Sequence, residues 1–397
     1  MLLAEMILLL NSLRAGPGGT DRVIEQLGLE RVAELALEEV LFRADLTELP
    51  HGNGDTFLIR IDFEHPGHEP VSALLRISPK EVARVTEETP RPVLSVTQDL
   101  TEVLVALYGC PGETVAGSRN VRWPGLWRDM SAFQPGVFPE RRVLSAAERI
   151  LSALDGGERE NLSRIAVRHR SDKWGAHRYA PHYERHLSRF RDRQITFVEI
   201  GVGGYHDPDL GGESLRMWKR FFPRALIHGV DITDKSPHHE PRITTWVADQ
   251  SDPDSLTALA EKLGPFDVIV DDGSHVNDHV VTSFEALFPH LRDGGVYVVE
   301  DLQTAYWPAF GGSPDADDNT SISFLKGLVD GLNHEEFPFG ARPGARATDA
   351  LISGVHFYHN LAFVERGGNR EGSPLARALE GAGLPAGAPN RKRFGKS

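Results

Sequence analysis

Cysteine is almost missing from this chain, with a single residue, Cys110, among 397. One thiol excludes an internal disulfide and any zinc site built from several cysteines. The composition therefore fits a reducing, cytoplasmic compartment. We expect Cys110 to be a small buried residue and not a nucleophile, because unpaired cysteine is usually buried.

Positive charge is also scarce. Asp and Glu number 57 against 43 Lys and Arg, which gives a formal net charge of −14 at pH 7. A general nucleic-acid binder needs a basic face, which this balance does not favour. We expect no nucleic-acid partner.

The hydrophobic start of the chain is too short to span a membrane. Residues 1–13 are fewer than the roughly 20 that cross a bilayer. They carry Glu5 and lack both a basic leading segment and a small-residue cleavage site, so a signal peptide is disfavoured. We expect an amphipathic helix that docks onto the protein, and no membrane partner.

Residues 1–145 are predicted to form an auxiliary α+β domain. Helical spacing of apolar residues covers 20–44, after a Gly-Gly-Thr-Asp sequence that suits a helix start. Two strands are expected at 56–63 and 71–77, and a further helix at 93–108. The region shows no catalytic constellation, so packing, oligomerisation or substrate shaping is its expected task.

A second domain is predicted over residues 146–370, followed by a flexible tail at 371–397. Short apolar strands alternate with helix-length segments, which is typical of a doubly wound, mostly parallel α/β sheet. The five expected strands cover residues 195–200, 225–230, 243–247, 266–270 and 296–299. A C-terminal antiparallel hairpin is expected at 355–365, with its turn near His359 and Asn360.

The first of these strands ends in a glycine-rich turn. Glu199 stands two residues ahead of Gly201, and Gly203 and Gly204 follow. A dinucleotide-binding turn has a further glycine where this chain has His206. The acidic-x-Gly-x-Gly arrangement resembles the first motif of class I S-adenosylmethionine-dependent methyltransferases, whose cofactor carries an ammonium and a sulfonium that suit carboxylates.

The later strand ends agree with such a cofactor. Asp231 is placed to accept hydrogen bonds from both ribose hydroxyls, and Asp249 and Gln250 to hold the adenine edge. Asp271 is placed to face the methionine part. Each acid alone has an alternative role as a solvated or capping residue, but acids at five successive strand ends favour a cofactor crevice.

Two neighbouring strands end abruptly in paired carboxylates, Asp271-Asp272 and Glu300-Asp301. Open α/β sheets bind ligands beyond the carboxyl ends of their strands, so these acids should share one rim. Mg²⁺ prefers oxygen ligands, and acids this close would otherwise raise one another's pKa values. Asp272, Glu300 and Asp301 are therefore the candidate metal ligands. The alternative is that Asp272 or Glu300 caps the helix after its strand.

His275 is the candidate general base. A diol hydroxyl beside the metal would have a lowered pKa, and a neutral imidazole accepts its proton as the oxygen attacks a methyl group. The alternative is a structural histidine bonded to the loop backbone.

Three motifs together resemble a known family. They are Glu199-Ile-Gly-Val-Gly-Gly, Val270-Asp-Asp-Gly-Ser-His and Val299-Glu-Asp-Leu-Gln-Thr-Ala-Tyr-Trp. They look like the metal-dependent O-methyltransferases of macrolide biosynthesis, of the mycinamicin VI and demethylmacrocin type, which methylate a deoxysugar hydroxyl on the antibiotic. The resemblance extends over most of the chain, the auxiliary domain included.

This resemblance implies two cofactors, S-adenosylmethionine and Mg²⁺, with the cation held by Asp272, Glu300 and Asp301 and with His275 as base. It also implies a homotetramer whose auxiliary domains help to complete neighbouring sites.

The resemblance also touches residues outside the acidic rim. Lys173 lies in a segment similar to one that covers the cofactor in this family, although a surface helix explains it nearly as well. Tyr306 and Trp307 are candidates for the floor of the sugar site, with ordinary packing as the alternative. The loop at 306–320 is a candidate lid.

The predicted activity is methyl transfer from S-adenosylmethionine to a sugar hydroxyl of a macrolide or other polyketide glycoside. One alternative is a metal-dependent methyltransferase of a catechol or other small phenol, which would share the acids. The other is a non-catalytic assembly protein that keeps a nucleotide-binding fold.

Overall fold

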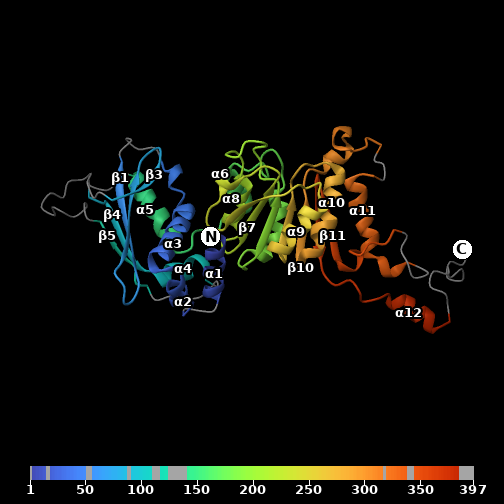
Figure 1. Ribbon diagram of the computed structural model, residues 1–397, viewed down its shortest axis with the longest axis horizontal. Helices are drawn as coiled ribbons and strands as arrows, with labels where there is room; N and C mark the ends of the chain where they lie inside the picture. Colours follow the sequence, from blue (N-terminus) through green and yellow to red (C-terminus); the bar gives the residue numbers. More distant parts are fainter. Residues whose placement is uncertain are drawn as a thin grey trace, which may run out of the picture.

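The chain folds into two α/β domains that lie side by side (Figure 1). The computed structural model describes residues 2–14, 18–50, 56–86, 91–109, 117–123, 141–315, 319–337 and 344–383. Cys110 and the last part of the expected tail lie outside these residues. Among the described residues, no helix has both the length and the apolar character needed to cross a bilayer.

The N-terminal domain packs helices against one face of a five-stranded sheet of order β3-β2-β1-β4-β5 (Figure 1). Its elements are α1 (Leu2–Arg14), α2 (Gly19–Leu27), α3 (Leu29–Ala44), β1 (Phe57–Glu64), β2 (Val71–Ile77), β3 (Val82–Val85), β4 (Leu94–Asp99), α4 (Leu100–Tyr108), β5 (Asn120–Arg122) and α5 (Arg141–Leu154). The expected docking helix is α1, which buries Met6, Leu9, Leu10 and Leu13 in the domain core.

The predicted helix at 93–108 was wrong in its first half. Residues Leu94–Asp99 form β4, whose side chains alternate between buried and half-buried positions, as a period of two requires. The helix begins only at Leu100, where the Asp99 side chain accepts a hydrogen bond from the backbone N–H of Glu102.

The predicted helix at 20–44 is two helices. Gly28, with φ +85°, separates α2 from α3. The N-cap of α2 is Gly18, which offers no side-chain cap, so the expected capping by the Gly-Gly-Thr-Asp sequence is not observed.

The boundary between the domains lies later than the sequence predicted. Residues 145 and 146 fall inside α5, and the buried side chains of this helix, among them Ile150 and Leu154, belong to the N-terminal core. The second domain therefore begins after Leu154.

The second domain is built on a seven-stranded sheet of order β11-β12-β10-β9-β6-β7-β8. Its strands are β6 (Thr196–Ile200), β7 (Leu226–Asp231), β8 (Ile243–Val247), β9 (Phe266–Asp271), β10 (Leu291–Val299), β11 (Ile352–Tyr358) and β12 (Leu361–Arg366). Its α-helices are α6 (Leu162–His169), α7 (Ala180–Leu187), α8 (Glu213–Phe221), α9 (Pro253–Leu263), α10 (Asn277–Leu287), α11 (Ser321–Leu332) and α12 (Pro374–Gly381). The five predicted parallel strands and the predicted hairpin are confirmed, and α12 forms within the expected tail.

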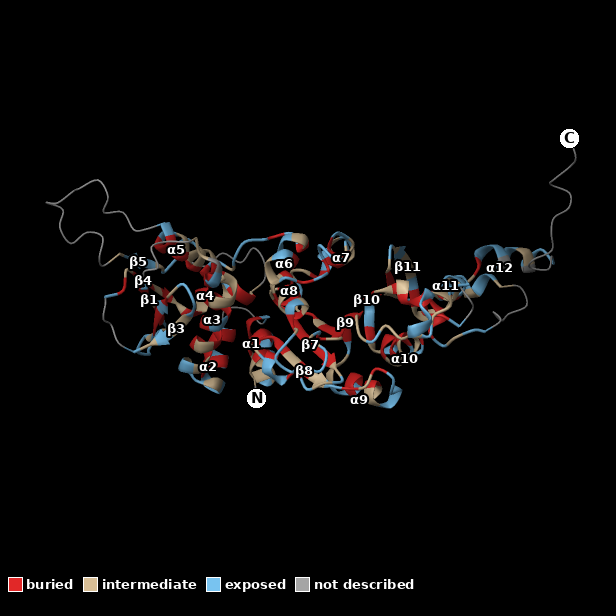
Figure 2. Ribbon diagram, turned by 90° about the horizontal axis from the view of Figure 1, so that it is seen from above, coloured by how far each residue is buried: buried red, intermediate tan, exposed pale blue. Residues whose placement is uncertain are grey.

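Both faces of this sheet are covered by apolar layers, and the central strands β7 and β9 are coloured mostly as buried in Figure 2. Val268, Ile269 and Val270 of β9 are fully buried, which explains why this strand reads as an unbroken apolar run. Burial of each such side chain stabilises the fold by about 1.5–3 kcal/mol.

The strand order reverses between β6 and β9, because the chain continues from β6 to β7 on one side and from β9 to β10 on the other. In open α/β sheets ligands bind beyond the strand ends at such a switch point.

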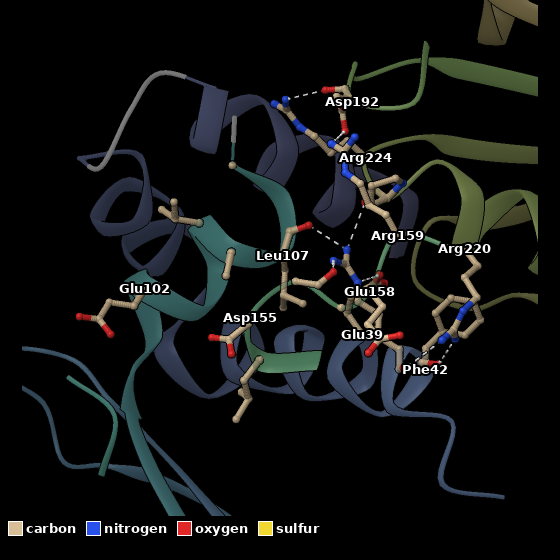
Figure 3. A pocket seen from close by; sticks show the side chains of 18 of the residues that line it. Glu39, Phe42, Glu102, Leu107, Asp155, Glu158, Arg159, Asp192, Arg220 and Arg224 are labelled. Carbon is tan, nitrogen blue, oxygen red and sulfur yellow. Dashed lines mark hydrogen bonds and ion pairs between the residues drawn. The ribbon is translucent and has the colours of Figure 1, made fainter. Parts of the chain in front are cut away.

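A buried ion pair joins the two domains. Nη2 of Arg242, in the second domain, lies 2.6 Å from Oε1 of Glu39 on α3, and both side chains are fully buried. Arg43, also on α3, places Nε 2.8 Å from the same Glu39 oxygen. Arg220 adds hydrogen bonds to the carbonyls of Phe42 and Arg43, beside an interdomain cavity of about 550 Å³ (Figure 3).

Candidate active site

The two strands that end in paired acids are neighbours. β9 pairs with β10 in parallel, with Asp271 opposite Val299. All four acids therefore lie at one edge of the sheet, as predicted. On its other side β9 pairs with β6, whose end carries the glycine-rich turn.

Gly201 brings the turn into close contact with the acidic rim. Its φ is +90°, and a β-carbon there would lie 2.0 Å from the carbonyl oxygen of Asp272. Only glycine permits this approach. The turn and the Asp272 loop are consequently fixed against each other.

A crevice of about 650 Å³ opens at this point of the sheet. Its walls include most of the residues predicted from the sequence to bind cofactor, metal or substrate, namely Gly201, Gly203, Asp231, Asp249, Gln250, Asp272, His275 and Asp301. The volume falls in the usual range for a cofactor or small-molecule site.

Asp231 is held rigidly in the crevice wall at the end of β7. Its Oδ2 accepts a hydrogen bond of 3.0 Å from the backbone N–H of Val202, and its Oδ1 accepts one of 2.9 Å from that of Thr233. Each oxygen keeps a further lone pair for a ligand hydroxyl.

Gln250 lines the crevice, but its amide group is hydrogen-bonded to other residues of the protein. Its oxygen accepts the backbone N–H of Ser274 at 2.8 Å, and its nitrogen donates to Asp271 at 2.7 Å. The side chain thus holds the loop that carries His275. Asp249 lies beside it, half-buried, and its Oδ1 accepts hydrogen bonds from the backbone N–H and the hydroxyl of Ser251.

Asp271 does not face the cofactor crevice, contrary to the sequence prediction. It is buried, and it accepts hydrogen bonds from Gln250, from the hydroxyl of Ser283 and from Tyr297. Burial raises its pKa to about 6. Its oxygens stabilise the interior behind the crevice, and Asp271 does not line that space.

Glu199 is also buried behind the crevice wall, so the structure does not support direct contact with a cofactor. It accepts hydrogen bonds from Ser214 Oγ at 2.7 Å and from Trp218 Nε1 at 3.1 Å. These bonds anchor α8 to the end of β6.

Lys173 forms ion pairs with three of the acids behind the crevice. Its ammonium nitrogen lies 2.7 Å from Asp272 Oδ2, 2.7 Å from Glu300 Oε1 and 3.3 Å from Glu199 Oε1, and its side chain is fully buried. Burial alone would lower the pKa of Lys173, but Asp272 and Glu300 outweigh it and hold the pKa well above its usual value. Lys173 is therefore a charged internal counter-ion, and it does not cover the cofactor as predicted.

Two tyrosines bind the metal candidates from outside the sheet. Tyr183, on α7, donates a short hydrogen bond to Oε1 of Glu300. Tyr179 donates to Oδ1 of Asp301 at 2.7 Å. Neither tyrosine was predicted as a site residue. Tyr179 is the N-cap residue of α7 and Tyr183 lies four residues later, and this spacing was the only sign in the sequence that the two side chains point in one direction.

Two carboxylate oxygens are directed at His275. Its Nε2 lies 4.0 Å from Asp272 Oδ1 and 3.7 Å from Asp301 Oδ2, while the other oxygen of each acid bonds to Lys173 or Tyr179. His275, Asp272 and Asp301 could hold one metal ion.

The donor set fits a hard divalent cation such as Mg²⁺, which binds carboxylates and keeps several waters. Three carboxylates share one ammonium, so negative charge is in surplus here, and burial together with Asp272 raises the pKa of Glu300 well above its ordinary value. A bound cation would relieve this surplus. Glu300 itself lies deeper, against Lys173 and Tyr183.

Tyr306 and Trp307 follow the acidic rim on a short 3-10 helix, Leu302–Tyr306, and the residue after it. They are 41% and 49% exposed, and neither lines the crevice. Their proposed contact with a sugar stays a prediction.

Each of the two domains matches a family of methyltransferases. Residues 9–119 match the family described as MycE methyltransferase N-terminal, and residues 198–302 match a methyltransferase domain family.

Curated relatives match along nearly the whole chain. The chain is 46% identical to 8-demethyl-8-alpha-L-rhamnosyl tetracenomycin-C 2'-O-methyltransferase of Streptomyces olivaceus, over 91% of this chain and 94% of that protein. It is 40% identical to mycinamicin VI 2''-O-methyltransferase of Micromonospora griseorubida, over 89% and 90%.

A solved structure is similar as well. The MycE methyltransferase of the mycinamycin biosynthetic pathway, in complex with Mg and SAH, superimposes with a TM-score of 0.84 at 37% identity and covers 96% of this chain and 99% of that one.

Proposed function

We propose a reaction for this chain from the premise that it belongs to the family of S-adenosylmethionine- and Mg²⁺-dependent sugar O-methyltransferases, of the mycinamicin VI and demethylmacrocin type. It transfers a methyl group to a deoxysugar hydroxyl of a macrolide or other polyketide glycoside. The observation that carries this proposal is the convergence of Asp272, Asp301 and His275 at the mouth of the crevice.

The crevice residues divide between the two ligands. Asp231 would accept the ribose hydroxyls of S-adenosylmethionine, and the turn at Gly201 and Gly203 lets the cofactor approach the backbone. Asp272 and Asp301, with Glu300 behind them, would hold Mg²⁺.

The chemistry needs one proton acceptor. S-adenosylmethionine supplies the methyl group, and Mg²⁺ supplies positive charge that favours an ionised hydroxyl. As the sugar oxygen bonds to the methyl carbon, the sulfur–carbon bond breaks and its electron pair returns to sulfur. Nε2 of His275 takes the hydroxyl proton, and Asp301 stabilises the resulting imidazolium.

The acceptor sugar and the aglycone of the substrate are proposed from the named reactions of the relatives. The named reactions of relatives include a 2'-O-methylation on rhamnosyl tetracenomycin-C and a 2''-O-methylation of mycinamicin VI, so the aglycone can be an aromatic polyketide or a macrolide in this family. We expect a 6-deoxyhexose hydroxyl with a neighbouring hydroxyl as the acceptor.

A panel of such glycosides, incubated with S-adenosylmethionine with and without EDTA, tests the proposal by mass spectrometry. Methylation of at least one glycoside that stops with EDTA and returns with Mg²⁺ is the expected result. Methylation of small catechols but of no glycoside would instead support the phenol alternative. Failure to bind S-adenosylmethionine in calorimetry would support the non-catalytic one.

A homotetramer and a cytoplasmic location also remain predictions. Light scattering on the purified protein gives the assembly directly, and a monomer would contradict the first.

A further inference from the structure

Three potential metal ligands meet at the far edge of the sheet. They are His186 at the end of α7, His356 on β11 and Glu365 on β12. Nδ1 of His186 and Nε2 of His356 each lie 3.9 Å from Oε1 of Glu365, and one ligand atom from each residue falls within 4.8 Å of the others. Ligand atoms of a tetrahedral zinc ion are roughly 3.3 Å apart, as follows from bond lengths near 2.0–2.2 Å. A small contraction of side chains closes the difference.

The cluster is separate from the crevice. None of its three residues lines that space. The imidazole of His186 is mostly enclosed, with 8% of its side chain exposed, whereas His356 is 43% exposed. The site is therefore shielded on the helix side and open to solvent on the hairpin side, where an ion can enter and keep a water.

The tautomer of His186 is suited to a metal. Its Nε2 lies 2.9 Å from the hydroxyl of Tyr358, and when this nitrogen carries the proton, the lone pair of Nδ1 is directed at Glu365. Ligating histidines in metal sites are commonly held by such an outer partner. The ring also stacks on Phe363 at 4.3 Å between centroids, which fixes its plane.

The hairpin leaves room for an ion beside these side chains. Gly354 keeps space beside the other ligands, since a β-carbon there would lie 3.4 Å from both Glu365 Oε2 and His356 Nε2.

A competing explanation is a polar surface cluster closed by Arg189. Nη1 of Arg189 lies 3.5 Å from Oε1 of Glu365, and its Nη2 donates to the carbonyl of Gly294. This explanation accounts for the glutamate, but it gives no reason for two imidazoles facing the same oxygen.

We propose that His186, His356 and Glu365 form a second metal site that takes a borderline transition-metal ion, Zn²⁺ in the first instance. Two nitrogens and one oxygen suit such an ion, whereas the crevice offers mainly the oxygens that Mg²⁺ prefers. The ion ties α7 to the C-terminal hairpin. Because α7 also carries Tyr183, which bonds to Glu300, the site stabilises the helix that supports the acidic rim.

Cobalt absorption distinguishes this site from the crevice. The full-length protein is stripped with EDTA, saturated with Mg²⁺ to occupy the crevice, and titrated with Co²⁺. We expect one Co²⁺ per chain with the intense visible bands of a four-coordinate ion, and displacement of these bands by Zn²⁺. No uptake by the unaltered protein would overturn the proposal.

Variants locate the bound ion. His356→Ala and Glu365→Gln should lose the bands, and Tyr358→Phe should weaken binding about 10- to 100-fold, as expected for an outer partner. His359→Ala, at the exposed turn of the same hairpin, and Asp301→Asn, in the crevice, should retain them. Thermal unfolding of each variant without metal verifies that it folds. Bands that persist in both ligand variants, or that vanish in Asp301→Asn, would overturn the proposal.

Discussion

Oδ2 of Asp301 lies 3.7 Å from Nε2 of His275, although the two residues follow different strands of the sheet. Both adopt left-handed backbone conformations, with φ of +54° and +57°. Such conformations cost about 1–3 kcal/mol each and cluster at functional sites. The fold thus stabilises a strained pair whose two side chains face each other at the mouth of the crevice.

Replacement of the proposed base should lower the rate and leave cofactor binding intact. His275→Ala should reduce kcat about 10²- to 10⁴-fold, the usual contribution of a general base. Single-turnover methylation measures the rate, and calorimetry measures cofactor affinity. His359→Ala is the control, because this histidine is exposed at the hairpin turn and does not line the crevice. A variant that keeps full activity would show that His275 is structural.

Replacement of a metal-facing acid should raise the Mg²⁺ requirement. Removal of a residue that only supports a metal ligand usually weakens metal binding about 10- to 100-fold. Asp301 is a proposed ligand itself, so Asp301→Asn should weaken Mg²⁺ binding by more than this. A Mg²⁺ titration of methyl transfer measures this. Asp293→Asn, an acid whose side chain is 82% exposed, is the matched control and should behave like the unaltered protein. Equal Mg²⁺ dependence of both variants would contradict the assignment.

Removal of the internal counter-ion should destabilise the protein. Lys173→Met leaves Glu199, Asp272 and Glu300 without their shared cation, and loss of one partner of a buried ion pair costs about 3–5 kcal/mol. Urea unfolding measures the free energy. Lys326→Met, on the exposed face of α11, should change it by less than about 0.5 kcal/mol. A Lys173→Met protein as stable as the unaltered chain would show that the ammonium is not needed.

The junction of the two domains should depend on one buried pair. Glu39→Gln removes the carboxylate that Arg242 and Arg43 share and should destabilise the protein by about 3–5 kcal/mol. Differential scanning calorimetry should then show the two domains unfolding in separate transitions. A single transition at an unchanged Tm would contradict this.

Stability should fall on mild acidification because of a buried histidine. Burial lowers the pKa of His228 from 6.5 to about 4, and its Nδ1 accepts a hydrogen bond from Trp246. Between these pH values the unfolded chain binds a proton that the folded chain does not, so the free energy of unfolding decreases from pH 6.5 down to pH 4. At about 1.4 kcal/mol per pKa unit, this histidine accounts for up to about 3 kcal/mol. His228→Gln should flatten this part of the pH profile, and an unchanged slope would contradict the assignment.

The sequence revealed the sheet and its acidic edge because both follow from local patterns. β9 is fully buried, and its apolar run Val268–Val270 stops at Asp271. β10 repeats this pattern before Glu300. Parallel pairing then brings the two ends together without further information.

The direction of each acid was harder to predict. Asp271 and Asp272 are adjacent, yet one points into the interior and the other into the crevice. The choice depends on Ser283 and Tyr297, which come from other elements and are recognisable as partners only after folding. Lys173 was misplaced for the same reason, because the acids it neutralises lie on strands far along the chain.

Truncation of the chain can remove residues that the acidic rim needs. Lys173, Tyr179 and Tyr183 all precede β6, the first strand of the second domain. The matched methyltransferase family covers residues 198–302, and a fragment trimmed to those limits would keep the acids but lose the ammonium and both phenols that neutralise and orient them. The smallest autonomous catalytic unit should therefore begin no later than α6, at Leu162.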